Sequence, residues 1–175
     1  MEQNKSNKIL IILLIVITVV ALSVTAWALF LRKDAGPALA PDYAPKETET
    51  HAEAIPGDTG EKMEAPKGGG SVSLTYSNEV SIDLSDKAAK LIFANPGKST
   101  QDMVLQIVIQ DTVIVQSGTL KPGNRVTSLD LLAGAEGMLA PGGYEGKFVV
   151  LYYDPVSGEK AIVNTEIPVK IDVAE

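Results

Sequence analysis

The chain has 175 residues, a net charge of −7 and no cysteine. This length holds one domain with accessory segments, and the lack of cysteine excludes disulfides, thiolate metal sites, cysteine nucleophiles and lipid-modified cysteine anchors. The acidic balance argues against nucleic acid as a partner, because binding to phosphates needs a basic surface. The single histidine, His51, cannot build a multi-histidine metal site, so we expect neither an enzyme nor a bound metal or cofactor.

An uncharged apolar run covers residues 9–31 and is followed by Arg32 and Lys33. As an α-helix this run would extend about 34 Å, which is enough to cross a hydrocarbon core of about 30 Å. Trp27 lies near its far end, where aromatic side chains suit the membrane interface. We predict a short N-terminal tail at 1–8 and one transmembrane helix at 9–31, which makes the membrane the first expected partner.

A cleaved signal peptide is the alternative to a retained signal anchor. Its apolar region would measure about 7 to 15 residues and be followed by a small-x-small site. Val24-Thr25-Ala26 has that pattern but lies inside the apolar run, and Ala38-Leu39-Ala40 is followed by proline, so we favour retention. Basic residues are similarly frequent on both sides of the run, so they do not set the orientation. The short tail and the spacer that follows favour an extracytoplasmic C-terminal domain.

Residues 32–70 show no hydrophobic periodicity. They are rich in proline, glutamate and threonine, and they end in Gly68-Gly69-Gly70. Because few apolar side chains are present to offset the entropy of ordering, this composition predicts a disordered acidic linker. His51 falls within it and is expected to be solvated.

From residue 71 to residue 175 apolar and polar residues alternate with period two, the pattern of half-buried strands. The predicted strands, in chain order, cover residues 72–76, 80–84, 91–93, 103–109, 113–115, 126–132, 144–153 and 163–173. Turns rich in proline and glycine separate several of them, and one helical turn is expected within 133–140. Pro168 in the last strand predicts an edge position or a bulge, because proline cannot donate to a ladder. Residues 71–175 are therefore predicted to form an all-β domain, a β-sandwich of seven or eight strands.

The stretch Leu139-Ala140-Pro141-Gly142-Gly143-Tyr144, which precedes an apolar strand, resembles the tyrosine corner of immunoglobulin-like and fibronectin type III-like domains. In that corner the tyrosine hydroxyl binds the backbone of the loop. Tyr144 comes one residue earlier than in the fibronectin version, which leaves the hydrogen bond open. Over residues 71–175 the chain resembles small membrane-anchored Ig-like surface proteins of Gram-positive bacteria. The resemblance implies an Ig-like fold and a surface location, and it implies no chemistry.

Two short motifs have a ligand-binding alternative. Gly97-Lys98-Ser99 looks like the end of a phosphate-binding loop, but that loop needs a glycine where Ile92 stands, and a helix after it. Asp154 and Glu159 invite comparison with a calcium site, but the spacing of a calcium loop is absent. We predict a turn at the first motif and a solvated hairpin loop at residues 154–158.

Catalytic and sugar-binding candidates are weak. Ser99 or Ser117 could act as a nucleophile only with a lysine as its base, which would be unusual. A pair of carboxylates for glycoside hydrolysis stays an open alternative, because the two members of such a pair come together only in the folded chain and no sequence spacing reveals them. Tyr144, Phe148 and Tyr152 are expected to fill the core. Tyr153 points to the other face and is the one aromatic residue considered for stacking on a sugar.

The sequence therefore predicts a single-pass protein of the cell membrane whose C-terminal domain lies outside the cytoplasm. We expect a structural or protein-interaction module of the cell surface, with another envelope or surface protein as its partner. The alternative is a cell-wall carbohydrate-binding module that holds wall polysaccharide. Exposed aromatic side chains on one sheet face would favour this alternative.

Overall fold

The computed structural model describes residues 13–23, 25 and 40–175 and divides into two compact units, residues 1–35 and 36–175. In the first unit residues 13–23 are α-helical. Within the described residues no helix combines the length and the apolar character that a bilayer crossing requires. The remaining parts of the predicted tail, membrane span and linker lie outside the described residues: 1–8, 9–12, 24, 26–31 and 32–39.

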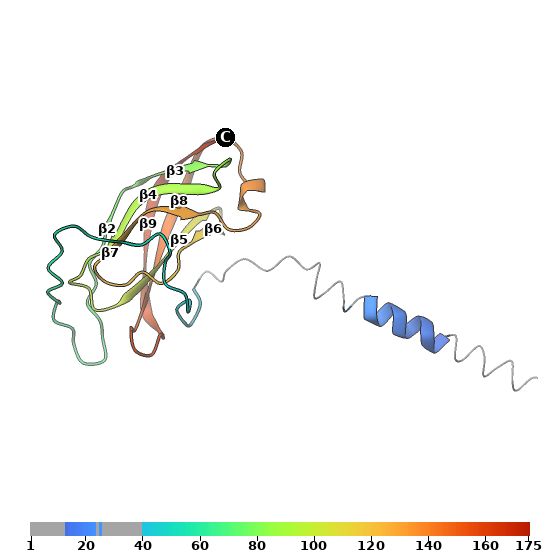
Figure 1. The fold of residues 1–175 in the computed structure, drawn as a ribbon, viewed down its shortest axis with the longest axis horizontal. Coiled ribbons are helices and arrows are strands. Elements are labelled where there is room, and N and C mark those ends of the chain that lie inside the picture. Colours follow the sequence, from blue (N-terminus) through green and yellow to red (C-terminus); the bar gives the residue numbers. More distant parts are fainter. Residues whose placement is uncertain (1–12, 24, 26–39) are drawn as a thin grey trace, which may run out of the picture. The chain divides into compact units, whose positions relative to one another are not determined.

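Strands dominate the described part of the second unit, which confirms the all-β prediction (Figure 1). The elements are β1 (Glu53–Ala54), β2 (Thr75–Tyr76), β3 (Glu79–Asp83), β4 (Ala88–Asn95), β5 (Asp102–Ile109), β6 (Thr112–Gln116), β7 (Asn124–Asp130), the 3-10 turn η1 (Ala135–Gly137), β8 (Gly142–Tyr153) and β9 (Lys160–Ala174). Each predicted strand has a counterpart, although the first is confined to β2, and η1 lies inside the predicted helical turn.

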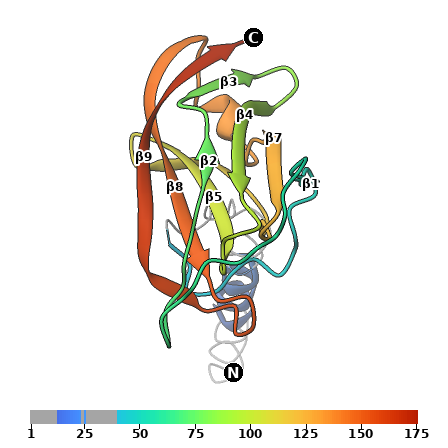
Figure 2. The same ribbon diagram turned by 90° about the vertical axis from the view of Figure 1, so that its left-hand side faces the viewer.

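The strands form one mixed sheet in the order β1-β7-β4-β3-β9-β8-β5-β6, with β2 paired to β4. The sequence predicts two packed sheets, whereas the structure joins the two layers through β3, which pairs antiparallel with β4 and parallel with β9. The sheet curls so that β3, β4 and β7 lie opposite β5 and β8 (Figure 2). Leu132 N–H donates to the Ile114 carbonyl at 2.9 Å, which ties the chain after β7 to β6 and draws the curled edges together.

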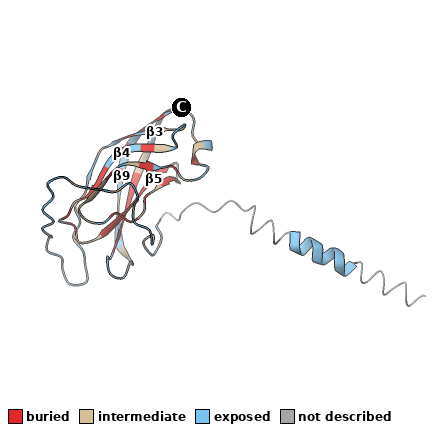
Figure 3. Cartoon of the chain, viewed as in Figure 1, coloured by how far each residue is buried: buried red, intermediate tan, exposed pale blue. Residues whose placement is uncertain are grey.

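The main core fills the inside of the curl, and Figure 3 shows buried residues along its strands. Alternate residues of β9 from Ile167 to Val173 are buried, while those between them are exposed. Phe93 of β4 and Phe148 of β8 meet edge to face, with ring centroids 6.2 Å apart. This arrangement is favourable for aromatic pairs and connects the two layers of the curl at their centre.

A second apolar cluster lies on the outer face of β5 and β8. Its buried members are Val104, Val108, Val149, Leu151 and Tyr153, and Ala44 and Val113 pack against them. Gln106 of β5 is also buried, and its amide nitrogen donates to Gln116 Oε1 at 2.7 Å. Strand β5 is therefore covered on both faces.

Residues 40–63 differ from the prediction of a disordered linker at 32–70. Their short strand β1 pairs with β7, and the Ile55 N–H donates to the Gly123 carbonyl at 2.9 Å. Backbone hydrogen bonds hold most of this stretch, and such bonds need no periodicity of apolar side chains. The sequence pattern therefore could not reveal the contact. We call residues 40–63 the docked segment, and the folded domain includes it.

Candidate functional site

The docked segment crosses the end of the sheet at which β8 turns into β9. Lys160 N–H donates to the Asp42 carbonyl at 2.9 Å, and Ala44 N–H donates to the Gly158 carbonyl at 3.0 Å. Further along, the segment runs beside the loop after β6, where Glu49 N–H donates to the Thr119 carbonyl at 3.0 Å. These contacts bring residues from distant parts of the sequence to one end of the domain.

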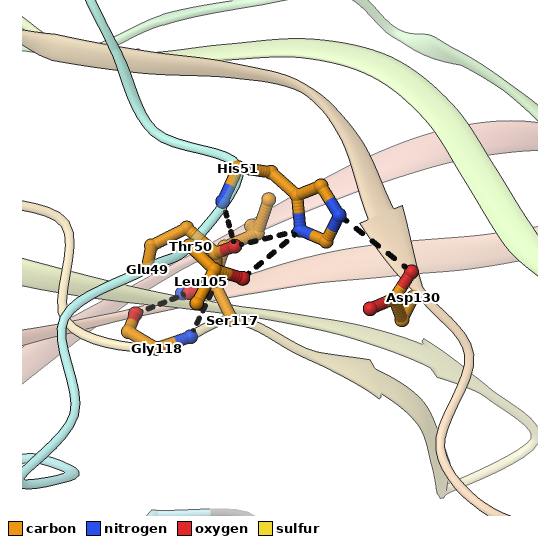
Figure 4. A network of polar contacts seen from close by, with 7 residues as sticks. All are labelled: Glu49, Thr50, His51, Leu105, Ser117, Gly118 and Asp130. Atoms are coloured by element: carbon orange, nitrogen blue, oxygen red, sulfur yellow. Dashed lines mark hydrogen bonds and ion pairs between the residues drawn. The ribbon is translucent and has the colours of Figure 1, made fainter.

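Figure 4 shows a polar network centred on Glu49, whose side chain is only 6% exposed. Its Oε2 accepts a hydrogen bond from the Gly118 N–H at 2.7 Å, and its Oε1 accepts one from the His51 backbone N–H at 2.8 Å. The His51 ring lies between two carboxylates, with Nδ1 3.1 Å from Glu49 Oε1 and Nε2 3.8 Å from Asp130 Oδ1. The network joins the docked segment to β7 and to the loop after β6.

The network contains residue types that also occur in catalytic sites, but the hydrogen bonds between them are not those of a catalytic site. The Ser117 hydroxyl accepts the Leu105 N–H at 2.9 Å and donates to the Gly118 carbonyl at 2.8 Å, so it serves the backbone. Among the described residues no hydrogen bond joins His51 to a serine, and no cluster of three or more His, Asp or Glu side chains is placed to bind a metal ion. The arrangement can hold the docked segment in place, and we describe it as a clamp.

The sequence did not reveal the clamp. Glu49 and Gly118 are 69 positions apart, so no local spacing relates them, and His51 was expected to be solvated. Glycine is needed at position 118, because a Cβ there would lie 2.8 Å from the Glu49 backbone nitrogen. The only feature of the sequence that could have indicated the clamp is Gly118 itself, a glycine that follows a strand without an obvious turn motif.

A groove lies beside the β8–β9 loop, with a volume of about 380 Å³. We call it the hairpin groove. Its lining includes the apolar side chains of Tyr43, Pro45, Pro155 and Val156 and the charged side chains of Lys46, Asp102, Lys121 and Asp154. At its base the buried Asp102 accepts a hydrogen bond from Lys121 at 2.5 Å through Oδ2, while Oδ1 is buried without a partner in the described part of the chain.

The first half of β9 has an open edge. Strand β3 pairs only with residues 170–174, so no described strand covers the edge of residues 160–168. Pro168 lies at one end of this stretch, which agrees with the predicted edge position. A register shift near Leu151 disturbs the other end, and Ile162 is fully exposed there. Proline and bulges are devices that prevent pairing with another chain, so strand addition at this edge is disfavoured.

Gly97-Lys98-Ser99 forms a turn, as predicted. The Asp58 carboxylate accepts the Gly97 N–H at 2.5 Å and the Gly60 N–H at 2.9 Å. These two backbone hydrogen bonds, that from Gly97 foremost, hold the pKa of Asp58 below its usual range. The backbone N–H of Gly97 is thus already bound by a side-chain carboxylate of the chain itself. The Ser99 hydroxyl donates to the Ser73 carbonyl at 2.9 Å and is also a structural group.

Asp154 shapes the β8–β9 turn. Its Oδ1 accepts the N–H groups of Val156 and Ser157 at 2.9 and 2.7 Å. These hydrogen bonds, the Ser157 N–H first, lower the pKa of Asp154. Glu159 takes part through its backbone, which bridges to Tyr43. Both carboxylates lie in the predicted hairpin loop and its stem.

The aromatic residues considered for sugar binding are placed by the structure inside the domain. Phe148 and Tyr152 are buried in the main core, as predicted. Tyr153 lies on the other face but is fully buried, and its hydroxyl donates to the Pro41 carbonyl at 2.9 Å. Burial, with a smaller contribution from Asp42, raises the pKa of Tyr153 to about 12. This ring has no free face on which a sugar could stack.

Tyr144 forms the corner that the resemblance left open. Its hydroxyl donates to the Ala140 carbonyl and accepts the Ala140 N–H, both at 3.0 Å. The position of Tyr144, one residue early, is therefore compatible with a corner that closes on the residue four positions before it.

No protein-family model matches the chain, and no curated protein matches it. Among solved structures it is similar to AggA, the major subunit of aggregative adherence fimbriae type I from Escherichia coli. The identity is 10%, the match covers 60% of this chain and 95% of AggA, and the TM-score is 0.29. A similarity at this level carries no argument about the function of this chain.

Proposed function

We propose that this protein is a membrane-anchored surface protein whose Ig-like domain lies outside the cytoplasm and contacts another envelope or surface protein. The proposal combines an anchor, a fold type and a mode of action. Each part has its own support and its own test.

The anchor is supported by helix 13–23, and this observation carries the proposal. Its large apolar side chains are each more than half exposed: Leu13, Leu14, Ile15, Val16, Ile17, Val19, Val20 and Leu22. The hydroxyls of Thr18, Ser23 and Thr25 donate to the carbonyls four residues earlier at 2.8 to 2.9 Å. An apolar surface with internally satisfied hydroxyls is what a lipid environment requires, because an unpaired polar group there is costly.

The Ig-like fold is supported by the strand pairing. Strand β4 pairs with β3 and β7, while β8 pairs with β5 and β9. Ig-like sandwiches show the same pairing, the second strand with the first and fifth, and the sixth with the third and seventh. The Tyr144 corner at the start of β8 is a further feature of that fold.

Protein contact is favoured over carbohydrate binding. Sugar-binding faces depend on exposed aromatic rings, and the residue considered for this role, Tyr153, is buried. The polar groups of the clamp and of the turns form hydrogen bonds within the domain and stabilise its fold. The loops and outer surfaces of a rigid domain then remain as the contact region, which is how Ig-like domains commonly act.

The anchor is tested with the full chain and with a Val16→Asp/Val20→Asp variant. We expect the unaltered chain to stay in the membrane pellet after extraction at high pH and the variant to be released. Release of both chains would contradict the anchor.

Orientation and partner are tested on intact cells. A cysteine at the exposed Met138 is expected to react with a membrane-impermeant maleimide, and a photo-crosslinking residue at Val163 to yield one adduct of defined mass. A chain labelled only after lysis would contradict the extracytoplasmic location. Adducts of many sizes, or none, would contradict a specific protein partner.

A further inference from the structure

The β8–β9 hairpin lies where the chain joins the domain from the helical unit. Asp42, Tyr43 and Ala44 run along the hairpin stem, bonded to Lys160 and Gly158. Figures 1 and 2 show the hairpin turn and the start of the docked segment at one end of the domain, with the C-terminus of β9 at the other. The first described residues of the domain therefore lie at the hairpin end.

The connection is short. Only residues 32–39 separate the apolar run from Ala40. Eight residues extend at most about 29 Å. If the apolar run lies in a bilayer, the hairpin stays within that reach of its surface.

The hairpin end carries exposed apolar side chains. Val156 at the turn is 94% exposed, Ile162 is fully exposed and Tyr43 is 62% exposed. The turn is also rigid, because Asp154 Oδ1 accepts two backbone N–H groups and Gly158 N–H donates to the Asp154 carbonyl at 2.8 Å. The fixed turn therefore presents the Val156 side chain to its surroundings.

The charges near the turn are slightly acidic. Asp42, Asp102, Asp154 and Glu159 lie beside Lys46, Lys121 and Lys160 on this end of the domain. Such a set gives no attraction to anionic headgroups. Contact with lipid would therefore depend on apolar burial, with tyrosine at the level of the headgroups, where that residue is enriched.

We infer that the β8–β9 turn, with Val156 at its tip and Tyr43 and Ile162 beside it, inserts into the interface of the bilayer that holds the chain's own helix. This inference rests on the proposed anchor. Insertion would fix the orientation of the domain and hold the η1 end away from the membrane.

The test uses the full chain in phosphatidylcholine vesicles. Because the chain has no cysteine, one introduced cysteine carries a single environment-sensitive fluorophore. Val156→Cys reports on the tip, and Met138→Cys, 61% exposed next to η1, is the matched control. We expect blue-shifted emission and quenching by brominated acyl chains at position 156 and neither at 138, with no change when phosphatidylglycerol is added.

A second pair of variants separates the protein's own insertion from that of the dye. With the label on Ser157→Cys, the Val156→Asp substitution should reduce the quenching several-fold. Equal signals at 156 and 138 in chains that float with the vesicles would overturn the inference and leave the anchor intact. A signal that grows with protein density, together with cross-links through position 156, would assign the tip to a second copy. Chains that do not float would overturn the anchor and, with it, this inference.

Discussion

The hydroxyl of Tyr144 makes two hydrogen bonds to one residue, the carbonyl and the N–H of Ala140. Tyr144→Phe keeps the ring and removes both bonds. We expect the free energy of unfolding to fall by about 1 kcal/mol, as measured by urea denaturation. Tyr76→Phe is the matched control, since Tyr76 is exposed and no hydrogen bond of its hydroxyl is found among the described residues. An equal loss in both variants would contradict a structural role for the corner.

Asp58 links the docked segment to the turn at Gly97, and its pKa is lowered from 3.8 by backbone N–H groups. A depressed pKa in the folded state adds stability that is present above 3.8 and is lost as the pH falls through the folded pKa. We expect Asp58→Asn to be less stable than the unaltered chain at about pH 6 and the difference to shrink towards about pH 2.5. The measurement is the urea midpoint across this range.

The control for this pH series is Asp172→Asn, a change on the exposed face of β9. It leaves the hydrogen bonds of Asp58 in place, so the acid dependence that these bonds produce should persist. A difference between the unaltered chain and Asp58→Asn that is constant with pH would show that the carboxylate charge is not what stabilises the turn.

At the level of single residues, the sequence predicted side chains that act locally. Pro168 indicated an edge, Asp154 a hairpin loop and Gly97 a turn, because each of these depends on its neighbours in the chain. The partners of Glu49 and Tyr153 could not be predicted, since Gly118 and Pro41 approach them only in the folded domain. Tyr153 faces away from the main core as the alternation implied, and only the docked segment explains why the hydroxyl of this buried residue has a partner.

The docked segment is the element that the clamp controls. In Gly118→Ala the new Cβ would lie 2.8 to 2.9 Å from the backbone of Glu49 and Thr48, so the segment must shift. We expect faster hydrogen exchange in residues 44–55 and a loss of about 1 to 3 kcal/mol in unfolding free energy. Gly143→Ala is the control, because a Cβ there meets no atom within 4 Å. Unchanged exchange in the segment would contradict the clamp.

Elements with strong alternation were the most predictable. The predicted 163–173 strand became β9, with Ile167, Val169, Ile171 and Val173 buried, because alternation directly encodes one buried face. Strand β5 was located correctly, but its second buried face was not foreseen, since covering it depends on Ala44 and Val113. The residues of β1 gave no signal at all, because two residues paired through their backbone need no apolar pattern.

For the whole domain, the boundary can be tested with two fragments that start at Ala40 and at Ser71 and end at Glu175. The shorter one lacks the acceptor of Tyr153, the clamp and the bonds between the docked segment and the hairpin. With each hydrogen bond worth about 1 kcal/mol, we expect a clearly lower urea midpoint for the shorter fragment. Equal midpoints would show that the folded domain begins at Ser71, as the sequence predicted.

The parallel pairing of β3 with β9 also governs the order of assembly during synthesis. Residues 79–83 leave the ribosome before the other long strands, yet the residues that lie against them, 170–174, belong to the last described strand in chain order. Until then β3 and β8 each lack a neighbour, and the nascent chain exposes two unpaired edges. Closure is therefore a late event that depends on long loops, which slows folding. Chaperones or proteases that meet the chain before Lys170 has been translated would find it open.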